Sequence, residues 1–134
     1  MHSMTNTITL IARVLLALLF IVAGLGKLGN VEGFAGYMAS GGLPAFLAWP
    51  AIAFEILGGI AILIGFQTRI VAYALAAFCV VTGLMFHFDP ADQMQMTQLL
   101  KNLALAGGYL LLGLHGAGAL SVDAKFGRTG AATA

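Results

Sequence analysis

Four apolar segments, each close to the length of a membrane-spanning helix, constrain what this chain can fold into. They cover about residues 8–28, 44–64, 70–88 and 99–114 of the sequence. A helix needs about 20 apolar residues to cross the ~30 Å hydrocarbon layer of a bilayer. Helices are expected because an isolated strand would leave its backbone polar groups unsatisfied in lipid. The sequence therefore predicts an all-α integral membrane four-helix bundle.

The composition agrees with a lipid environment. Hydrophobic residues make up 60% of the chain and charged residues 8%, whereas soluble domains average about 45–50% and about 25%. The formal net charge of +1 gives no electrostatic basis for nucleic-acid binding. Cys79 is the single cysteine, which excludes an intrachain disulfide, a CxxC redox pair and a thiolate metal cage. The bilayer is the expected partner, and no nucleic acid is.

The connection between the first two segments, residues 29–43, has structure of its own. Asn30 is suited to cap a short helix over residues 31–39, and the glycine pair that follows is suited to end it. Phe34, Tyr37 and Met38 would then rest on the membrane surface. We expect a short interfacial helix here.

The remaining connections and the ends complete a single domain over residues 1–134. Residues 65–69 predict a tight turn, and Asp89 followed by Pro90 predicts the start of the fourth helix. The first segment could also be a signal peptide, but no Lys or Arg precedes it and Arg13 lies within it, which favours a retained helix. We expect residues 123–134 to be a mobile tail.

Basic residues indicate the orientation, since they are more frequent in cytoplasmic loops. An N-terminus inside places four basic residues toward the cytoplasm and two toward the outside. They are Arg13, Arg69, Lys125 and Arg128 inside, and Lys27 and Lys101 outside. We expect both termini to be cytoplasmic.

Glu55 lies near the middle of the second segment, where an ionisable residue costs roughly 2.5–3.5 kcal/mol on insertion scales. One interpretation is a carboxylate that carries protons or contacts a ligand. The other is a structural carboxylate that pairs with Arg13 or an amide. Intramembrane ionisable residues are commonly functional, so we treat Glu55 as a candidate catalytic residue.

Arg13 and Lys27 share one face of the first helix, about 21 Å apart at 1.5 Å per residue, with Glu55 between them in depth. Both side chains could extend to the two interfaces without further function. Arg13 lies deeper in its segment, so a partner is expected for it. Both residues are candidate ligand-binding positions.

A second polar group is expected toward the outer side. Lys27, His87, Lys101 and Asn102 would emerge at the same level and could converge on one pocket, and Tyr109 shares a helix face with Asn102. Interfacial anchoring explains any one of these residues, whereas their convergence favours a binding site.

Two other groups of residues have side chains that bind metals or haem. His87 and His115 fall at opposite ends of the bundle and cannot ligate one haem between them. Met94 and Met96, with Met85 and His87 nearby, could bind Cu(I), but methionine at an interface is usually plastic packing. We predict no metal site.

Taken together, these residues resemble the DoxX family of small bacterial inner-membrane proteins over about residues 11–122. The features that carry the resemblance are Arg13 with residues 24–27, residues 33–37 before Leu43-Pro44, Glu55 ahead of Gly58, residues 65–69, His87, Lys101-Asn102 before Gly107-Gly108, and residues 116–121. The resemblance implies a four-helix inner-membrane protein linked to redox functions: thiosulfate oxidation coupled to quinone, complexes that handle thiol and superoxide stress, or tolerance of quinones and catechols. The distinctive soluble subunit with which some members work is absent from this chain.

The leading hypothesis is a quinone-binding membrane component of a redox system. Lys27, His87, Lys101 and Asn102 would donate hydrogen bonds to the quinone carbonyls, and Glu55 and His87 would carry protons. Electrons would come from a soluble or membrane redox partner or directly from the substrate, because the chain has no electron carrier of its own. The alternative is a non-enzymatic transporter, sensor or scaffold subunit, in which a homo-oligomer is one possible state. Both leave open whether the chain itself is an enzyme.

Overall fold

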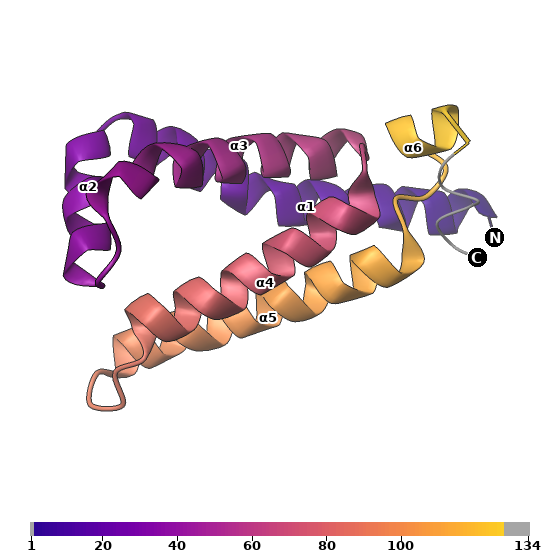
Figure 1. Cartoon of the computed structure of the whole chain (residues 1–134). Coiled ribbons are helices and arrows are strands. Elements are labelled where there is room, and N and C mark those ends of the chain that lie inside the picture. Colours follow the sequence, from indigo (N-terminus) through magenta and orange to yellow (C-terminus); the bar gives the residue numbers. More distant parts are fainter. Residues whose placement is uncertain (1, 128–134) are drawn as a thin grey trace.

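The computed structural model describes residues 2–127, and all of its regular elements are helices (Figure 1). In chain order they are α1 (His2–Leu28), α2 (Val31–Ser40), the short 3-10 helix η1 (Ala45–Leu47), α3 (Ala48–Ile64), α4 (Thr68–His87), α5 (Gln93–His115) and α6 (Val122–Lys125). The predicted all-α fold is confirmed.

Three helical stretches are long and apolar enough to cross a membrane: Ser3–Leu28, Ala45–Ile64 and Thr68–His87. The fourth long helix, α5, has 23 residues but begins with several polar side chains and carries Lys101 and Asn102 near its middle. Its length suffices for a span, whereas its hydropathy is lower than that of the other three.

Helices α1 and α3 pack closely as an antiparallel pair because glycines remove side chains from their interface. A Cβ atom on Gly24 would lie 2.5 Å from Cγ1 of Ile56 and 3.3 Å from its backbone nitrogen. A Cβ atom on Gly59 would lie 3.1 Å from the backbone nitrogen of Ile21. Close backbone approach at small residues is how helices associate in lipid, where no hydrophobic effect drives them together.

Helices α4 and α5 form the second antiparallel pair, joined by residues 88–92. The prediction that Asp89 caps the fourth helix is wrong. The side chain of Asp92 accepts hydrogen bonds from the backbone N–H groups of Met94 and Gln95, and α5 begins at Gln93. Asp89 instead accepts a hydrogen bond from the N–H of Ala91, which closes a turn before the helix.

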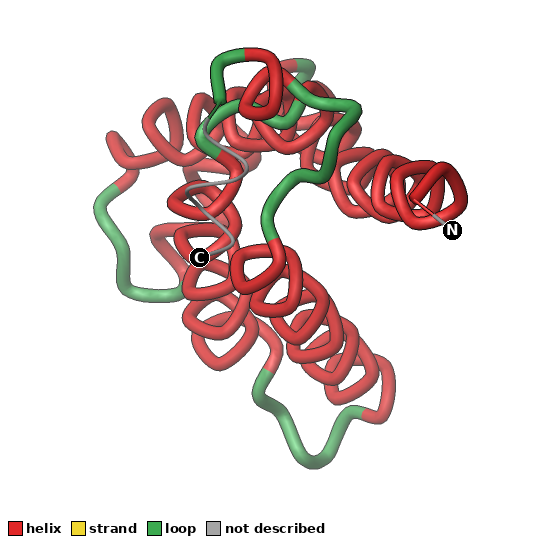
Figure 2. Tube along the Cα trace, turned by 90° about the vertical axis from the view of Figure 1, so that its right-hand side faces the viewer, coloured by secondary structure: helices red, strands yellow, loops and turns green. Residues whose placement is uncertain are grey.

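The two pairs meet at the α3–α4 turn and diverge from it, so that the α4–α5 pair slopes away from α1 and α3 in both views (Figure 1 and Figure 2). The predicted turn over residues 65–69 is present: Gly65 adopts a left-handed conformation with φ 74°. The buried core lies where the pairs come together, and its largest members include Phe20, Ile62, Leu75 and Tyr109. The opposite ends of the pairs are separated.

Helix α2 bridges the separated ends. As predicted, Asn30 caps it by accepting a hydrogen bond from the N–H of Gly33. The ring of Tyr37 stacks on Phe86 of α4 with centroids 4.9 Å apart. A Cβ atom on Gly41 would collide with the Phe86 ring, so a glycine permits this contact. Helix α2 is therefore tied to both pairs.

The end near the α3–α4 turn is closed by α6. Residue 123 was predicted to begin a mobile tail, but it lies within α6 and is buried. The Asp123 carboxylate accepts hydrogen bonds from the backbone N–H groups of Gln67 (2.8 Å) and Thr68 (2.9 Å), at the start of α4. Tertiary capping thus orders this segment, and the rest of the predicted tail, from residue 128, lies outside the described residues.

Candidate functional site

A cavity of about 380 Å³ lies between the two helix pairs at their diverging ends, and residues of α1 to α5 line it. Its aromatic lining comes from Phe20, Phe34, Tyr37, Phe78 and Phe86. From the sequence, Phe34, Tyr37 and Met38 were expected to rest on the membrane surface, whereas all three line the cavity. The other aromatic residues were not recognised, because core and cavity positions have the same spacing on a membrane helix.

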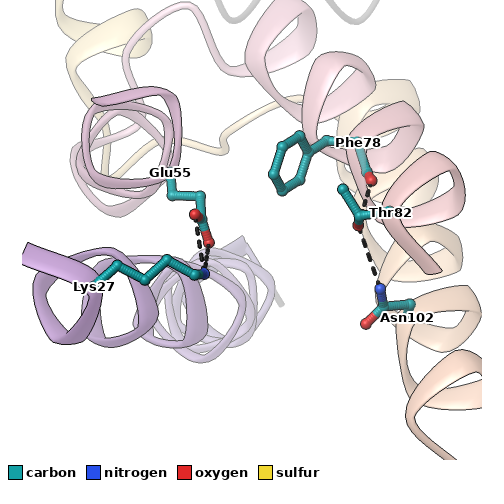
Figure 3. Close-up of polar contacts among 5 residues, drawn as sticks. All are labelled: Lys27, Glu55, Phe78, Thr82 and Asn102. Atoms are coloured by element: carbon teal, nitrogen blue, oxygen red, sulfur yellow. Dashed lines mark hydrogen bonds and ion pairs between the residues drawn. The ribbon is translucent and has the colours of Figure 1, made fainter. Parts of the chain in front are cut away.

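On one wall of the cavity, Lys27 and Glu55 form an ion pair (Figure 3). The Lys27 Nζ atom lies 2.8 Å from Oε1 and 3.0 Å from Oε2 of Glu55. The Glu55 side chain is 4% exposed and that of Lys27 is 29% exposed. The partner of Glu55 is therefore Lys27, and the predicted alternative of pairing with Arg13 is wrong.

Helix α2 covers this ion pair. The Lys27 ammonium also lies 5.0 Å from the centroid of the Phe34 ring, within the range of a cation–π contact. Tyr37 lines the same cavity, and partial burial raises the pKa of its hydroxyl above the ordinary value.

The opposite wall is formed by α4 and α5 (Figure 3). The Asn102 side-chain nitrogen donates a hydrogen bond to the backbone oxygen of Cys79 at 3.2 Å and lies 3.5 Å from the Thr82 hydroxyl. That hydroxyl donates to the backbone oxygen of Phe78 at 2.7 Å. Lys101 also lines the cavity, with an exposed side chain.

His87 lines the cavity from the end of α4. Its Nδ1 atom lies 2.7 Å from the side-chain oxygen of Gln95 in α5. With that oxygen as acceptor, Nδ1 carries the proton of the neutral ring and Nε2 remains the basic nitrogen. The sequence did not single out Gln95 as a site residue. Its place in the polar run that precedes the apolar part of the fourth helix was only a weak signal.

Five of the seven predicted site residues line one cavity: Lys27, Glu55, His87, Lys101 and Asn102. The other two lie elsewhere. The fully buried Arg13 donates hydrogen bonds to the backbone oxygens of Ile62 and Leu63 at the end of α3, and to that of Leu120. Buried Tyr109 donates to the backbone oxygen of Leu16 at 2.6 Å. Both connect elements of the fold and are absent from the cavity lining.

Sequence comparison adds the relationship to known proteins. The DoxX family model matches residues 8–88, which include Lys27, Glu55 and His87. The chain belongs to the DoxX family. The inner membrane protein YqjF of Escherichia coli is 40% identical over 123 residues, covering 92% of this chain and 95% of YqjF. The inner membrane protein YphA of the same organism is 34% identical over 123 residues, covering 87% and 88%.

A third relative carries a name that refers to an activity. It is the Bacillus subtilis protein named "Putative oxidoreductase CatD", 40% identical over 68 residues, which are 51% of each chain. No solved structure matches the chain significantly. The apolar helices and the two inner membrane relatives together establish a DoxX membrane protein with transmembrane helices.

Proposed function

We propose that this DoxX protein is a membrane-embedded quinone-binding component of a redox system. The observation that carries the proposal is the cavity between the helix pairs, which combines an aromatic lining with polar groups on two facing walls. Its volume of about 380 Å³ falls in the range of small-molecule sites. Aromatic side chains suit a flat ring, and the surrounding apolar helices suit an isoprenoid tail.

Protons and electrons must reach such a ring together when it is reduced. Glu55 and His87 are the cavity groups suited to exchange protons, and Lys101 offers a cation to a quinone oxygen. The electrons come from a soluble or membrane partner or from the substrate, in sulfur or thiol oxidation or in the handling of quinones and oxidative stress. The name of the relative CatD is consistent with this chemistry.

The alternative class, a transporter, sensor or scaffold, has less support. The cavity ends against Phe20, which belongs to a buried core that also contains Ile62, Leu75 and Tyr109. A solute would have to cross this apolar layer to reach the other end of the molecule. A cavity that ends at an apolar layer favours a bound ligand over a conducting path.

The membrane arrangement is part of the proposal. Helix α5 is the fourth span, α2 lies at the outer interface, and both termini are cytoplasmic. The N-terminal end of α1 and α6 lie at the same end of the molecule, as this topology requires (Figure 1). Labelling single cysteines at positions 32 and 125 with an impermeant reagent in intact cells tests it: position 32 should react, and position 125 should react only after lysis. Native mass spectrometry of the purified protein would reveal a second copy of the chain or a bound redox partner.

The decisive experiment extracts lipids from mildly purified protein and quantifies quinones by mass spectrometry. Glu55→Gln and His87→Ala are compared with two matched controls, Glu32→Gln on the exposed face of α2 and His115→Ala at the far end of α5. We expect near-stoichiometric quinone in the parent and both controls, with several-fold depletion in the two cavity variants. Quinone at the level of bulk lipid in all five proteins would refute the proposal and favour the alternative class.

A further inference from the structure

The hydrogen-bonding capacity left over in the cavity differs from what a quinone requires. A quinone carbonyl only accepts hydrogen bonds, so a quinone site needs donors. A quinol hydroxyl both donates and accepts, so a quinol site needs acceptors as well. Which groups of the cavity are already committed within the protein therefore decides which form fits.

Asn102 presents an acceptor. Its side-chain nitrogen faces the backbone oxygen of Cys79, a group that can only accept, and this contact fixes the orientation of the amide. The amide oxygen consequently turns toward the space between the helix pairs (Figure 3). Within residues 2–127, the side-chain hydrogen bonds of Asn102 are made by its nitrogen and none by this oxygen.

The ion pair also presents acceptors. Two N–H bonds of the Lys27 ammonium are directed to the Glu55 oxygens, and the Phe34 ring occupies a further side of the ammonium. Each Glu55 oxygen accepts one of these bonds and has a second lone pair to offer. The pair thus has little donor capacity left and retains acceptor capacity.

His87 adds a third acceptor. Its Nδ1 proton is directed to the Gln95 oxygen, which leaves the lone pair on Nε2. Lys101 is the one cavity cation in the described residues with neither a hydrogen bond nor an ion pair. Lys101 and the Tyr37 hydroxyl thus supply donors, and the hydroxyl can also accept, against acceptors on Asn102, Glu55 and His87.

From this imbalance we propose that the cavity binds a quinol, the hydroxyl-bearing reduced form, in preference to the quinone. The inference rests on the proposed function and specifies the ligand of that same site. The quinol hydroxyls donate to the cavity acceptors, and Lys101 donates to a quinol oxygen. A quinone would leave the acceptors of three side chains facing its own lone pairs, and an unpaired buried polar group is costly.

The test compares three ligands on the full-length protein in nanodiscs under argon: a decyl-tailed benzoquinone, its quinol, and the dimethyl ether of that quinol. Retained ligand is quantified by chromatography against empty nanodiscs, which corrects for partition into lipid. We expect the quinol to bind roughly tenfold more tightly than the quinone or the ether, since a site built around a hydroxyl rejects analogues that lack it.

Two variants locate the preference. Asn102→Leu and, independently, His87→Leu should each lower the quinol-to-quinone affinity ratio several-fold. Quinone binding in the same preparation controls for misfolding. Asn6→Leu, the same kind of change at the other end of the molecule, should leave the ratio unchanged.

The outcomes separate this inference from the proposed function. Quinone binding that equals or exceeds quinol binding, with both above empty nanodiscs, overturns the preference and leaves the quinone site standing. Absence of specific binding for all three ligands overturns both. A quinol preference that persists unchanged in both cavity variants overturns the assignment to these acceptors.

Discussion

Replacing Lys27 with methionine leaves the Glu55 carboxyl alone in the membrane interior, and the burial of the two side chains sets the size of the effect. Glu55 is 4% exposed, so it cannot recover its hydration when its partner is lost. Removing one member of a buried ion pair costs about 3–5 kcal/mol. We therefore expect Lys27→Met to lower the free energy of unfolding by about 3–5 kcal/mol at pH 7.

Glu55→Gln is the matched opposite change. Lys27 is 29% exposed and lies at the end of α1, so its ammonium can reach water once the carboxylate is gone. We expect a loss of about 1 kcal/mol at pH 7. The double variant should be close to Glu55→Gln alone, because no unpaired carboxylate remains.

The assay is reversible unfolding by SDS in mixed micelles, followed by circular dichroism at pH 7 for the parent, both single variants and the double variant. Equal losses for the two single variants would contradict the buried-carboxylate argument. So would a double variant that is as destabilised as Lys27→Met alone.

Further variants test other parts of the fold. Arg13→Met should lower the free energy of unfolding by about 3 kcal/mol, because it removes charge-assisted hydrogen bonds to three backbone oxygens; the SDS assay measures this, and Arg13→Lys should recover part of the loss. Gly24→Ala should cost about 1–3 kcal/mol by forcing α1 from Ile56. Gly26→Ala, with open space around it, should be neutral or stabilising, and equal effects at the two glycines would contradict the packing argument. Asn30→Ala should speed amide hydrogen exchange in α2 by removing its cap, a loss of about 1 kcal/mol, whereas Asn30→Asp should not.

The sequence was most informative where local chemistry determines structure. Apolar length located the helices, and the Asn30 cap located α2, because both depend on neighbouring residues alone. The convergence of Lys27, His87, Lys101 and Asn102 was also foreseen, since residues at one depth on neighbouring helices can meet only if those helices pack together.

The side-chain partners of individual residues were harder to predict from the sequence, because they depend on how each helix is rotated about its own axis. Glu55 was expected to pair with Arg13 or an amide, whereas the close packing at Gly24 brings Lys27 of α1 next to it. Arg13 donates hydrogen bonds to backbone oxygens at the end of a helix. A pattern of side chains in the sequence does not reveal such acceptors. Asp123 caps α4 through a contact between segments that are distant in the sequence. The sequence does not show such a contact, so Asp123 was assigned to the polar tail.

The most direct test of the central claim is photolabelling with an azido-quinone in native membranes, mapped by peptide mass spectrometry. The claim predicts labels on cavity residues of both helix pairs, such as Leu19 in α1 and Val81 and Met85 in α4, that excess unlabelled ligand suppresses. Labels confined to outward residues such as Leu15 and Leu18, insensitive to competitor, would contradict a quinone site between the pairs.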